Sequence, residues 1–348
     1  MEIYKILDRF ELMHPTDSRL SDLRRAYIDK DLYSIFKVAN ASEDLRRAIL
    51  EKNIHSIFRL TEGCEISGSV DDLKKAIIDQ NFYSIFRLLP DIFDDLKKAV
   101  CEDNVHSMYR LLNADQLKKV IEYDNPWAVY DYLIEYTDSQ FAHALKFMLN
   151  DEIDFDEDCL SRGQLQSKLW LVNELNKIGV DLGTVFLCAG WYGTLATMML
   201  ESNLSIEKIR SFDVDETTES IAEIFNRPWV INSWKFKPVV QDIHDIDFVE
   251  HCYIVSKGDN DFERLWDSPN TVINTSCEHI HDFEEWYAKI PSGKLVVMQC
   301  NNYFEIEEHV NCHETLESFA NQTPLDVELY SGELKLDKYK RFMRIGYK

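Results

Sequence analysis

The stretch that decides the fold is Thr184-Val-Phe-Leu-Cys-Ala189, followed by Gly190-Trp191-Tyr192-Gly193 and then by TLATMML at 194–200. The apolar run predicts a strand that is buried on both faces. Glycines mark a turn, and the small and apolar residues after it predict a helix. A buried strand that leads through a glycine-bearing turn into a helix is typical of a parallel α/β sheet.

Downstream of this stretch, strands and helices alternate. Four more apolar strands are predicted at 208–214, 235–240, 271–275 and 294–300, and a helix lies between the first two of these. The tail, 326–348, alternates polar and apolar residues and predicts an antiparallel hairpin. The sequence therefore predicts a doubly wound α/β sheet that is closed by an antiparallel strand.

Unusual residues gather where the predicted strands end. They are Gly190 and Gly193 after the first strand, Asp213 at the end of the second, Asp242 after the third, Asn274, Glu278 and His279 after the fourth, and Asn301, Asn302 and Tyr303 after the fifth. Parallel sheets bind ligands beyond the carboxyl ends of their strands. A glycine turn lets a ligand approach the backbone, and an acid that closes the second strand is placed to accept from ribose hydroxyls.

With these motifs, residues 160–348 resemble the class I S-adenosylmethionine-dependent methyltransferases, whose Rossmann-like sheet is doubly wound and ends in an antiparallel strand. The resemblance implies S-adenosylmethionine as the cofactor and methyl transfer as the activity. It implies that Asp213 binds the ribose. It also implies two groups of cofactor contacts, namely the glycine loop Gly190, Trp191, Tyr192 and Gly193, and the adenine neighbours Asp242 and Ile243.

The segment after the fourth strand corresponds to the catalytic or substrate motif of that family. Asn274 is placed to accept from an amino group, and Glu278 or His279 to act as a base for a hydroxyl or a ring nitrogen. The alternative is structural, with Asn274 capping the next helix and His279 packing against it. Asn301, Asn302 and Tyr303 are predicted to line the acceptor pocket, or else to shape a turn.

A helix is predicted at 161–178, just ahead of the first strand. In the resembling family this segment often closes over the cofactor, so Gln164 and Lys168 are candidates for contacts with its methionine end. The alternative is an amphipathic helix that only covers the sheet.

Metal-binding residue types occur near the fourth and fifth strands. They are Glu278, His279, His281, Glu308, His309, Cys312 and His313. His309 and His313 are four residues apart and would share one face of a helix. No recognised ligand motif is present, so the sequence analysis predicts no metal site.

The N-terminal part carries an internal repeat. A motif of the form Asp-Leu-Lys/Arg-Lys/Arg-Ala begins at residues 22, 44, 72 and 95, and a variant begins at Gln116. Apolar residues at helical spacing indicate two short helices in each copy. Such units share a core only when stacked, so residues 1–150 are predicted to form an all-α, solenoid-like repeat domain and residues 160–348 the cofactor-binding domain. The Asp at each start suits a helix N-terminus, and the basic pairs are interpreted as solvated helix faces.

The charge of the chain is strongly acidic. Lys and Arg number 38 against 62 Asp and Glu, for a formal charge of −24, and residues 151–348 hold 18 basic against 36 acidic side chains. This balance disfavours nucleic acid and an anionic membrane as partners. Eight cysteines without paired spacing predict free thiols in a reducing compartment, and the start of the chain lacks the apolar core of a signal peptide. We therefore expect a cytoplasmic protein.

The sequence is thus interpreted as a methyltransferase that acts on a small molecule or a protein, with the repeats as an adaptor or as a surface for a homo-oligomer. Two alternatives remain from other classes. One is an interaction scaffold that binds the cofactor without turnover, and the other is a nucleic-acid methyltransferase. NAD-dependent Rossmann enzymes share the Gly and Asp spacing, but they have no reason to carry the C-terminal hairpin.

Overall fold

The computed structural model describes residues 2–28, 125–258 and 261–348 of the chain. The chain divides into two compact units, Met1–Thr137 and Asp138–Lys348. The boundary between the units differs from the one predicted at residue 150. Helix α12 (Gln140–Asn150) belongs to the second unit and packs against helices of that unit.

Three helices of the first unit are described, namely α1 (Ile3–Met13), α2 (Ser18–Ile28) and α11 (Pro126–Thr137). Most of the predicted repeats lie outside the described residues. The first copy falls in α2, which begins at Ser18, so Asp22 lies inside the helix and not at its start as expected. Arg24 of the same copy forms an ion pair with Glu11 of α1 at 3.5 Å, in agreement with a solvated, charge-balanced face.

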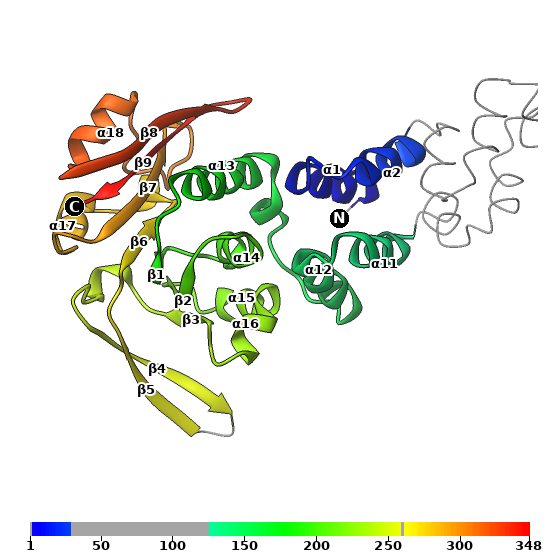
Figure 1. Ribbon diagram of the computed structural model, residues 1–348, viewed down its shortest axis with the longest axis horizontal. Coiled ribbons are helices and arrows are strands. Elements are labelled where there is room, and N and C mark those ends of the chain that lie inside the picture. Colours follow the sequence, from blue (N-terminus) through cyan, green and yellow to red (C-terminus); the bar gives the residue numbers. More distant parts are fainter. Residues whose placement is uncertain (1, 29–124, 259–260) are drawn as a thin grey trace, which may run out of the picture. The chain divides into compact units, whose positions relative to one another are not determined.

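The second unit is built on a seven-stranded sheet with the strand order β3-β2-β1-β6-β7-β9-β8 (Figure 1). Its parallel strands are β1 (Gly183–Cys188), β2 (Ile206–Asp213), β3 (Phe236–Val240), β6 (Thr271–Asn274) and β7 (Leu295–Asn301). Strands β8 (Val327–Lys335) and β9 (Lys340–Tyr347) form the C-terminal hairpin, and β9 runs antiparallel to β7. The predicted doubly wound sheet with its antiparallel closing strand is confirmed.

Helices cover both faces of this sheet. Those of the second unit, besides α12, are α13 (Arg162–Ile178), α14 (Thr194–Glu201), α15 (Thr218–Phe225), α16 (Arg227–Ile231), α17 (Phe283–Ala288) and α18 (Leu316–Gln322). Helix α13 begins where the Ser161 side chain accepts from the backbone N–H of Gln164, and it ends at Gly179 in the left-handed conformation. Figure 1 shows α13, α14 and α15 on one side of the sheet and α17 and α18 on the other.

One hydrophobic core of the second unit lies between the sheet and α17. The strands contribute Phe186 of β1, Phe212 of β2 and Val296 of β7 to this core, and α17 contributes Trp286. Each of these side chains is fully buried or nearly so. Burial of this apolar area from water is the main force that fixes the strands beside one another.

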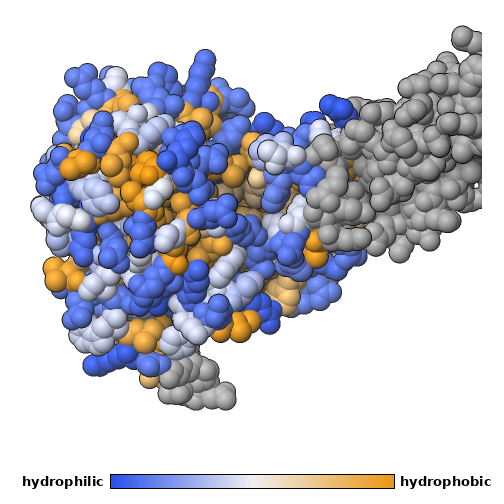
Figure 2. Space-filling view, in the orientation of Figure 1, coloured by the Kyte–Doolittle hydropathy of each residue, from blue (hydrophilic) through white to orange (hydrophobic). Residues whose placement is uncertain are grey.

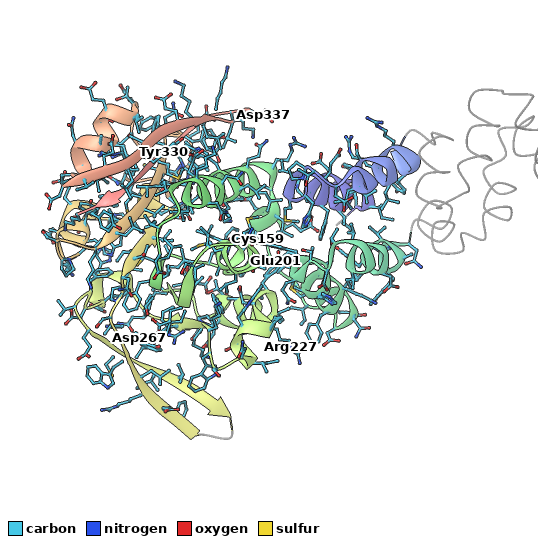
Figure 3. The ribbon with its side chains drawn as sticks, viewed as in Figure 1. Cys159, Glu201, Arg227, Asp267, Tyr330 and Asp337 are labelled. Carbon is cyan, nitrogen blue, oxygen red and sulfur yellow. The ribbon has the colours of Figure 1, made fainter. Side chains whose placement is uncertain are left out.

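A second, two-stranded sheet is inserted between β3 and β6, and the sequence analysis missed it. It consists of β4 (His251–Gly258) and β5 (Asp261–Asp267). The buried carboxylate of Asp267 anchors its base, because it accepts from Arg210 of β2 at 2.8 Å and from Lys208 at 2.6 Å (Figure 3). The hairpin exposes Ile254, Phe262 and Trp266.

Among the described residues, the model contains no helix with the length and apolar character needed to cross a bilayer. Hydrophilic side chains cover much of the face of the molecule drawn in Figure 2, with apolar residues in smaller groups between them.

Candidate active site

A cavity of about 660 Å³ opens at the carboxyl ends of the parallel strands in the second unit. The chain runs from β1 outward to β2 and β3 and then returns to β6 on the other side of β1, so the sheet reverses its winding between β1 and β6. Ligands of doubly wound folds bind at this point. Side chains that follow β1, β2, β6 and β7 line the cavity, together with the start of α13 and the β8–β9 turn, where Asp337 is labelled in Figure 3.

The turn after β1 has an unusual backbone. Ala189 and Trp191 have φ values of 54° and 47°, in the left-handed region that non-glycine residues seldom adopt. Gly190 lies so close to β2 that an added Cβ would come within 2.0 Å of Ser211 Oγ. Such strained turns persist only where the surroundings hold them, and they gather at functional sites. The turn places Ala189 and Trp191 on the cavity wall.

The carboxylate of Asp213 holds this turn to the end of β2. Its Oδ2 accepts from the backbone N–H of Trp191 at 2.7 Å, and its Oδ1 accepts from the backbone N–H of Asp215 at 3.1 Å. Asp213 also lines the cavity. A carboxylate oxygen accepts more than one hydrogen bond, so both oxygens keep capacity for a ligand hydroxyl.

A buried ionic cluster forms the opposite wall, after β6 and β7. Glu278 belongs to the short 3-10 helix η4 (Cys277–His279) and is almost fully buried. Its Oε1 accepts from the Asn301 side-chain amide at the end of β7 and from the Arg341 guanidinium at the start of β9. Its Oε2 has no hydrogen-bond partner among the described residues. The cluster therefore fixes the carboxylate while it leaves one oxygen uncommitted beside the cavity.

Two histidines meet next to this carboxylate. The rings of His279 and His309 stand edge to face with centroids 4.6 Å apart, and both line the cavity. Burial lowers the pKa of His279 from its usual value, so the neutral imidazole prevails at neutral pH. A neutral imidazole is able to accept a proton or to bind a metal ion.

The start of α13 closes the cavity on a third side. Gln164 lines it, and the Gln164 Oε1 atom accepts from the Lys168 ammonium at 3.0 Å. Lys168 itself is buried one turn further along the helix and is not among the cavity-lining residues, and burial lowers its pKa to about 8. Lys168 therefore holds the Gln164 side chain and does not itself line the cavity.

The structure brings only part of the predicted site together. The predicted residues that line the cavity are Trp191, Asp213, Gln164, Glu278, His279, Asn301 and Tyr303. Gly190, Tyr192 and Gly193 shape the turn without lining it. Gly193 has a φ of 63°, and the Tyr192 hydroxyl accepts from the backbone N–H of Asp156 in front of α13.

Four predicted contacts take structural roles. Asn274 is fully buried, and its Oδ1 accepts from the backbone N–H of Ser276, so it shapes the turn before η4 without capping that helix. Asn302 accepts from the backbone N–H of Lys340 and braces the β9 start. Asp242 caps the 3-10 helix η3 (Ile243–Asp245) and pairs with His244 at 2.8 Å, while Ile243 packs in the core. None of the four is among the cavity-lining residues.

Sequence reasoning missed the contribution of the C-terminal hairpin. Tyr339 and Arg341 both line the cavity, the Tyr339 ring stacks on Tyr303 with centroids 5.3 Å apart, and Arg341 neutralises Glu278. The only sequence signal was an arginine at the start of the last predicted strand. The sequence pattern indicated His309 as a metal-binding residue type but did not indicate that it lines the cavity.

The two cysteines near the strand ends are structural. Cys277 and Cys300 are buried, and burial raises the pKa of both thiols well above its usual range. They remain protonated at neutral pH and fill space, as expected for small apolar side chains.

No protein-family model and no curated protein matches the chain. Part of the chain is similar to solved methyltransferase structures over most of their length and resembles the class I S-adenosylmethionine-dependent type. The N-methyltransferase NodS from Bradyrhizobium japonicum has a TM-score of 0.37 and 10% identity, covering 53% of this chain and 94% of NodS. Magnesium protoporphyrin IX methyltransferase from Synechocystis, solved with bound S-adenosylmethionine, has a TM-score of 0.37 and 11% identity, covering 63% and 95% of the two chains. We infer no function from matches at these values.

Proposed function

We propose that the second unit binds S-adenosylmethionine and acts as a methyltransferase on a small molecule or a protein. The observation that carries this proposal is the position of Asp213. It is an acid at the end of β2 that lines a cavity at the winding reversal of the sheet and holds the strained turn after β1. An acid in this position is placed to accept from both hydroxyls of a ribose.

The residues present fit a nucleoside cofactor. The cavity volume of about 660 Å³ lies within the range of pockets that enclose small molecules. Asp213 would hold the ribose, Trp191 offers an aromatic face beside it, and Gln164 offers an amide for the amino-acid end. S-adenosylmethionine supplies a methyl group on a positively charged sulfur, a chemistry that asks the protein mainly to position the acceptor.

The acceptor side of the proposed site is the wall that Glu278, His279, Asn301 and Tyr303 form. Methyl transfer to an oxygen or a nitrogen requires that the acceptor's proton be removed. His279 is uncharged because burial lowers its pKa, so it is able to accept that proton. Asn274 is fully buried and does not line the cavity, so the proposal gives it no contact with an acceptor amino group.

Charge supports a small molecule or a protein as the acceptor. Residues 151–348 hold 36 acidic against 18 basic side chains, which repels a polyanion from most of the surface of the second unit. We propose a cytoplasmic location and an adaptor or oligomerisation role for the N-terminal repeats on the sequence pattern alone.

The test is a calorimetric titration of the full chain with S-adenosylmethionine and S-adenosylhomocysteine. We expect the wild type to bind with a micromolar dissociation constant and Asp213→Ala to bind at least about 10-fold more weakly. Asp215→Ala is the matched control. Asp215 is also an acid and lies two residues from Asp213. Its carboxylate accepts from the backbone N–H of Thr217, and it is not among the cavity-lining residues. No binding by the wild type, or equal losses in both variants, would refute the proposal.

A further inference from the structure

The cluster of Glu278, His279 and His309 has the composition of a metal site. One ligand atom from each side chain lies within 4.8 Å of the other two. Ions held by imidazole and carboxylate at about 2.1 Å bring their ligand atoms to roughly 3.0–3.5 Å from one another. Small side-chain rotations are therefore enough to close the cluster around an ion.

The carboxylate of this cluster has an uncommitted oxygen in a buried place. Glu278 is 1% exposed, and its Oε1 is taken by Asn301 and Arg341. Its Oε2 has no partner among the residues that the structure describes. Such an oxygen carries a desolvation cost that a ligand would remove. Glu278 is one of the residues that line the cavity.

The ring of His309 is oriented as metal-binding histidine rings usually are. Nδ1 of His309 lies 2.6 Å from the backbone carbonyl oxygen of Tyr303. A carbonyl oxygen only accepts, so Nδ1 carries the proton and Nε2 keeps its lone pair. The His279 ring stands edge to face against the His309 ring, with ring centroids 4.6 Å apart. A hydrogen bond from one ring nitrogen to a carbonyl is the usual way in which a protein orients a metal-binding imidazole.

We propose that Glu278, His279 and His309 bind one divalent transition-metal ion at the acceptor side of the cavity. Two imidazoles and one carboxylate suit Zn²⁺, Mn²⁺ or Fe²⁺ better than Mg²⁺ or Ca²⁺, which prefer all-oxygen sites. Three protein ligands leave coordination positions open on the ion, and all three of these residues line the cavity. The site is therefore of the kind that binds a substrate oxygen.

The proposal deepens the proposed function and rests on it for the role of the ion. An ion here would bind an oxygen-bearing acceptor and lower the pKa of its hydroxyl. His279 then serves as a ligand and the ion replaces it as the group that favours loss of the proton. The binding of the ion itself does not depend on the cofactor, so the two proposals fail separately.

The experiment is a titration of chelator-treated full-length protein with Co²⁺, followed by visible absorption, and with Zn²⁺ and Mn²⁺ by calorimetry. The variants are His279→Ala and His309→Ala. His281→Ala is the matched control, because His281 is an exposed histidine two residues from His279. Glu278 is left unchanged, because its removal would leave the buried Arg341 guanidinium without a charge partner and would destabilise the fold.

We expect the wild type and His281→Ala to bind one strongly absorbing Co²⁺ ion per chain, and each of the other two variants to bind it about 100-fold more weakly. The metal site would be overturned if His279→Ala and His309→Ala bound Co²⁺ as tightly as the wild type does, or if the wild type bound none. Asp213→Ala should keep its Co²⁺ spectrum while it loses S-adenosylmethionine. Metal binding without cofactor binding by the wild type would overturn the proposed function alone.

Discussion

At the scale of single residues, Lys168 shows how burial changes a charge. It is 6% exposed, and burial lowers its pKa from 10.5 to about 8. The folded protein therefore binds fewer protons than the unfolded chain between these two pH values, so its free energy of unfolding rises with pH in that window. Below pH 8 the buried ammonium is a destabilising feature of α13.

Replacing this lysine gives a prediction with a defined pH dependence. Lys168→Met should unfold with a free energy about 3 kcal/mol higher than the wild type at pH 7, and the difference should shrink as the pH rises from 8 to 10.5. Urea denaturation at a series of pH values measures it. Lys177→Met on the exposed side of the same helix is the control, with an expected change below about 0.5 kcal/mol. A difference that does not vary with pH would contradict the assignment.

Gly190 is the other residue with a sharp consequence. A Cβ at this position would lie 2.0 Å from Ser211 Oγ, so Gly190→Ala should lower the free energy of unfolding by about 1–3 kcal/mol. The partner residue supplies the control. Ser211→Ala removes the clashing oxygen, so the double variant should recover part of the loss in a double-mutant cycle. Simple additivity of the two changes would rule out the clash as the cause.

At the scale of elements, the sequence predicted the parallel strands to within two residues at each end. It did so because long apolar runs such as 184–189 are buried on both faces, and burial on both faces leaves an unbroken apolar signature. The same reasoning missed β4 and β5. Their outer positions hold Ile254, Phe262 and Trp266, which are exposed, so apolar character there does not report the core.

Several site residues were predicted from their position at or after the end of a strand, but not all of these residues line the cavity. Asp213 and Glu278 follow strands and do line the cavity, whereas Asp242, in an equivalent sequence position, caps η3 instead. A cap and a ligand contact use the same residue types, so sequence cannot separate them. Arg341 and His309 reach the cavity through long-range packing of the last hairpin and of the loop after β7, which no local pattern encodes.

The β4–β5 hairpin gives a prediction at this scale. Asp267 is buried between Arg210 and Lys208 and ties the hairpin to β2. Asp267→Asn leaves the Arg210 guanidinium buried without a charge partner, which should cost about 3–5 kcal/mol of unfolding free energy. Arg264→Gln, at an exposed position of the same hairpin, should change it by less than about 0.5 kcal/mol. Chemical denaturation compares the two, and similar effects would argue against the anchor.

At the scale of the whole molecule, the second unit combines a fold that sequence periodicity predicts with a site that only the folded chain reveals. The winding reversal of the sheet brings the ends of β1, β2, β6 and β7 to one cavity. The proposed ribose contact at Asp213 and the proposed metal site at Glu278 lie on opposite walls of that cavity. Cofactor and acceptor would then meet between them.

The ion pair of Glu278 with Arg341 sets an order of events during biosynthesis. Arg341 follows Glu278 by 63 residues, so a nascent chain carries the acidic half of the pair for some time before the basic half exists. At ordinary rates of translation this delay is roughly 3–13 s. Until β9 arrives, β7 presents an open edge and the carboxylate must stay hydrated. The cavity wall to which Arg341 contributes therefore forms only after β9 has been synthesised and has docked against β7.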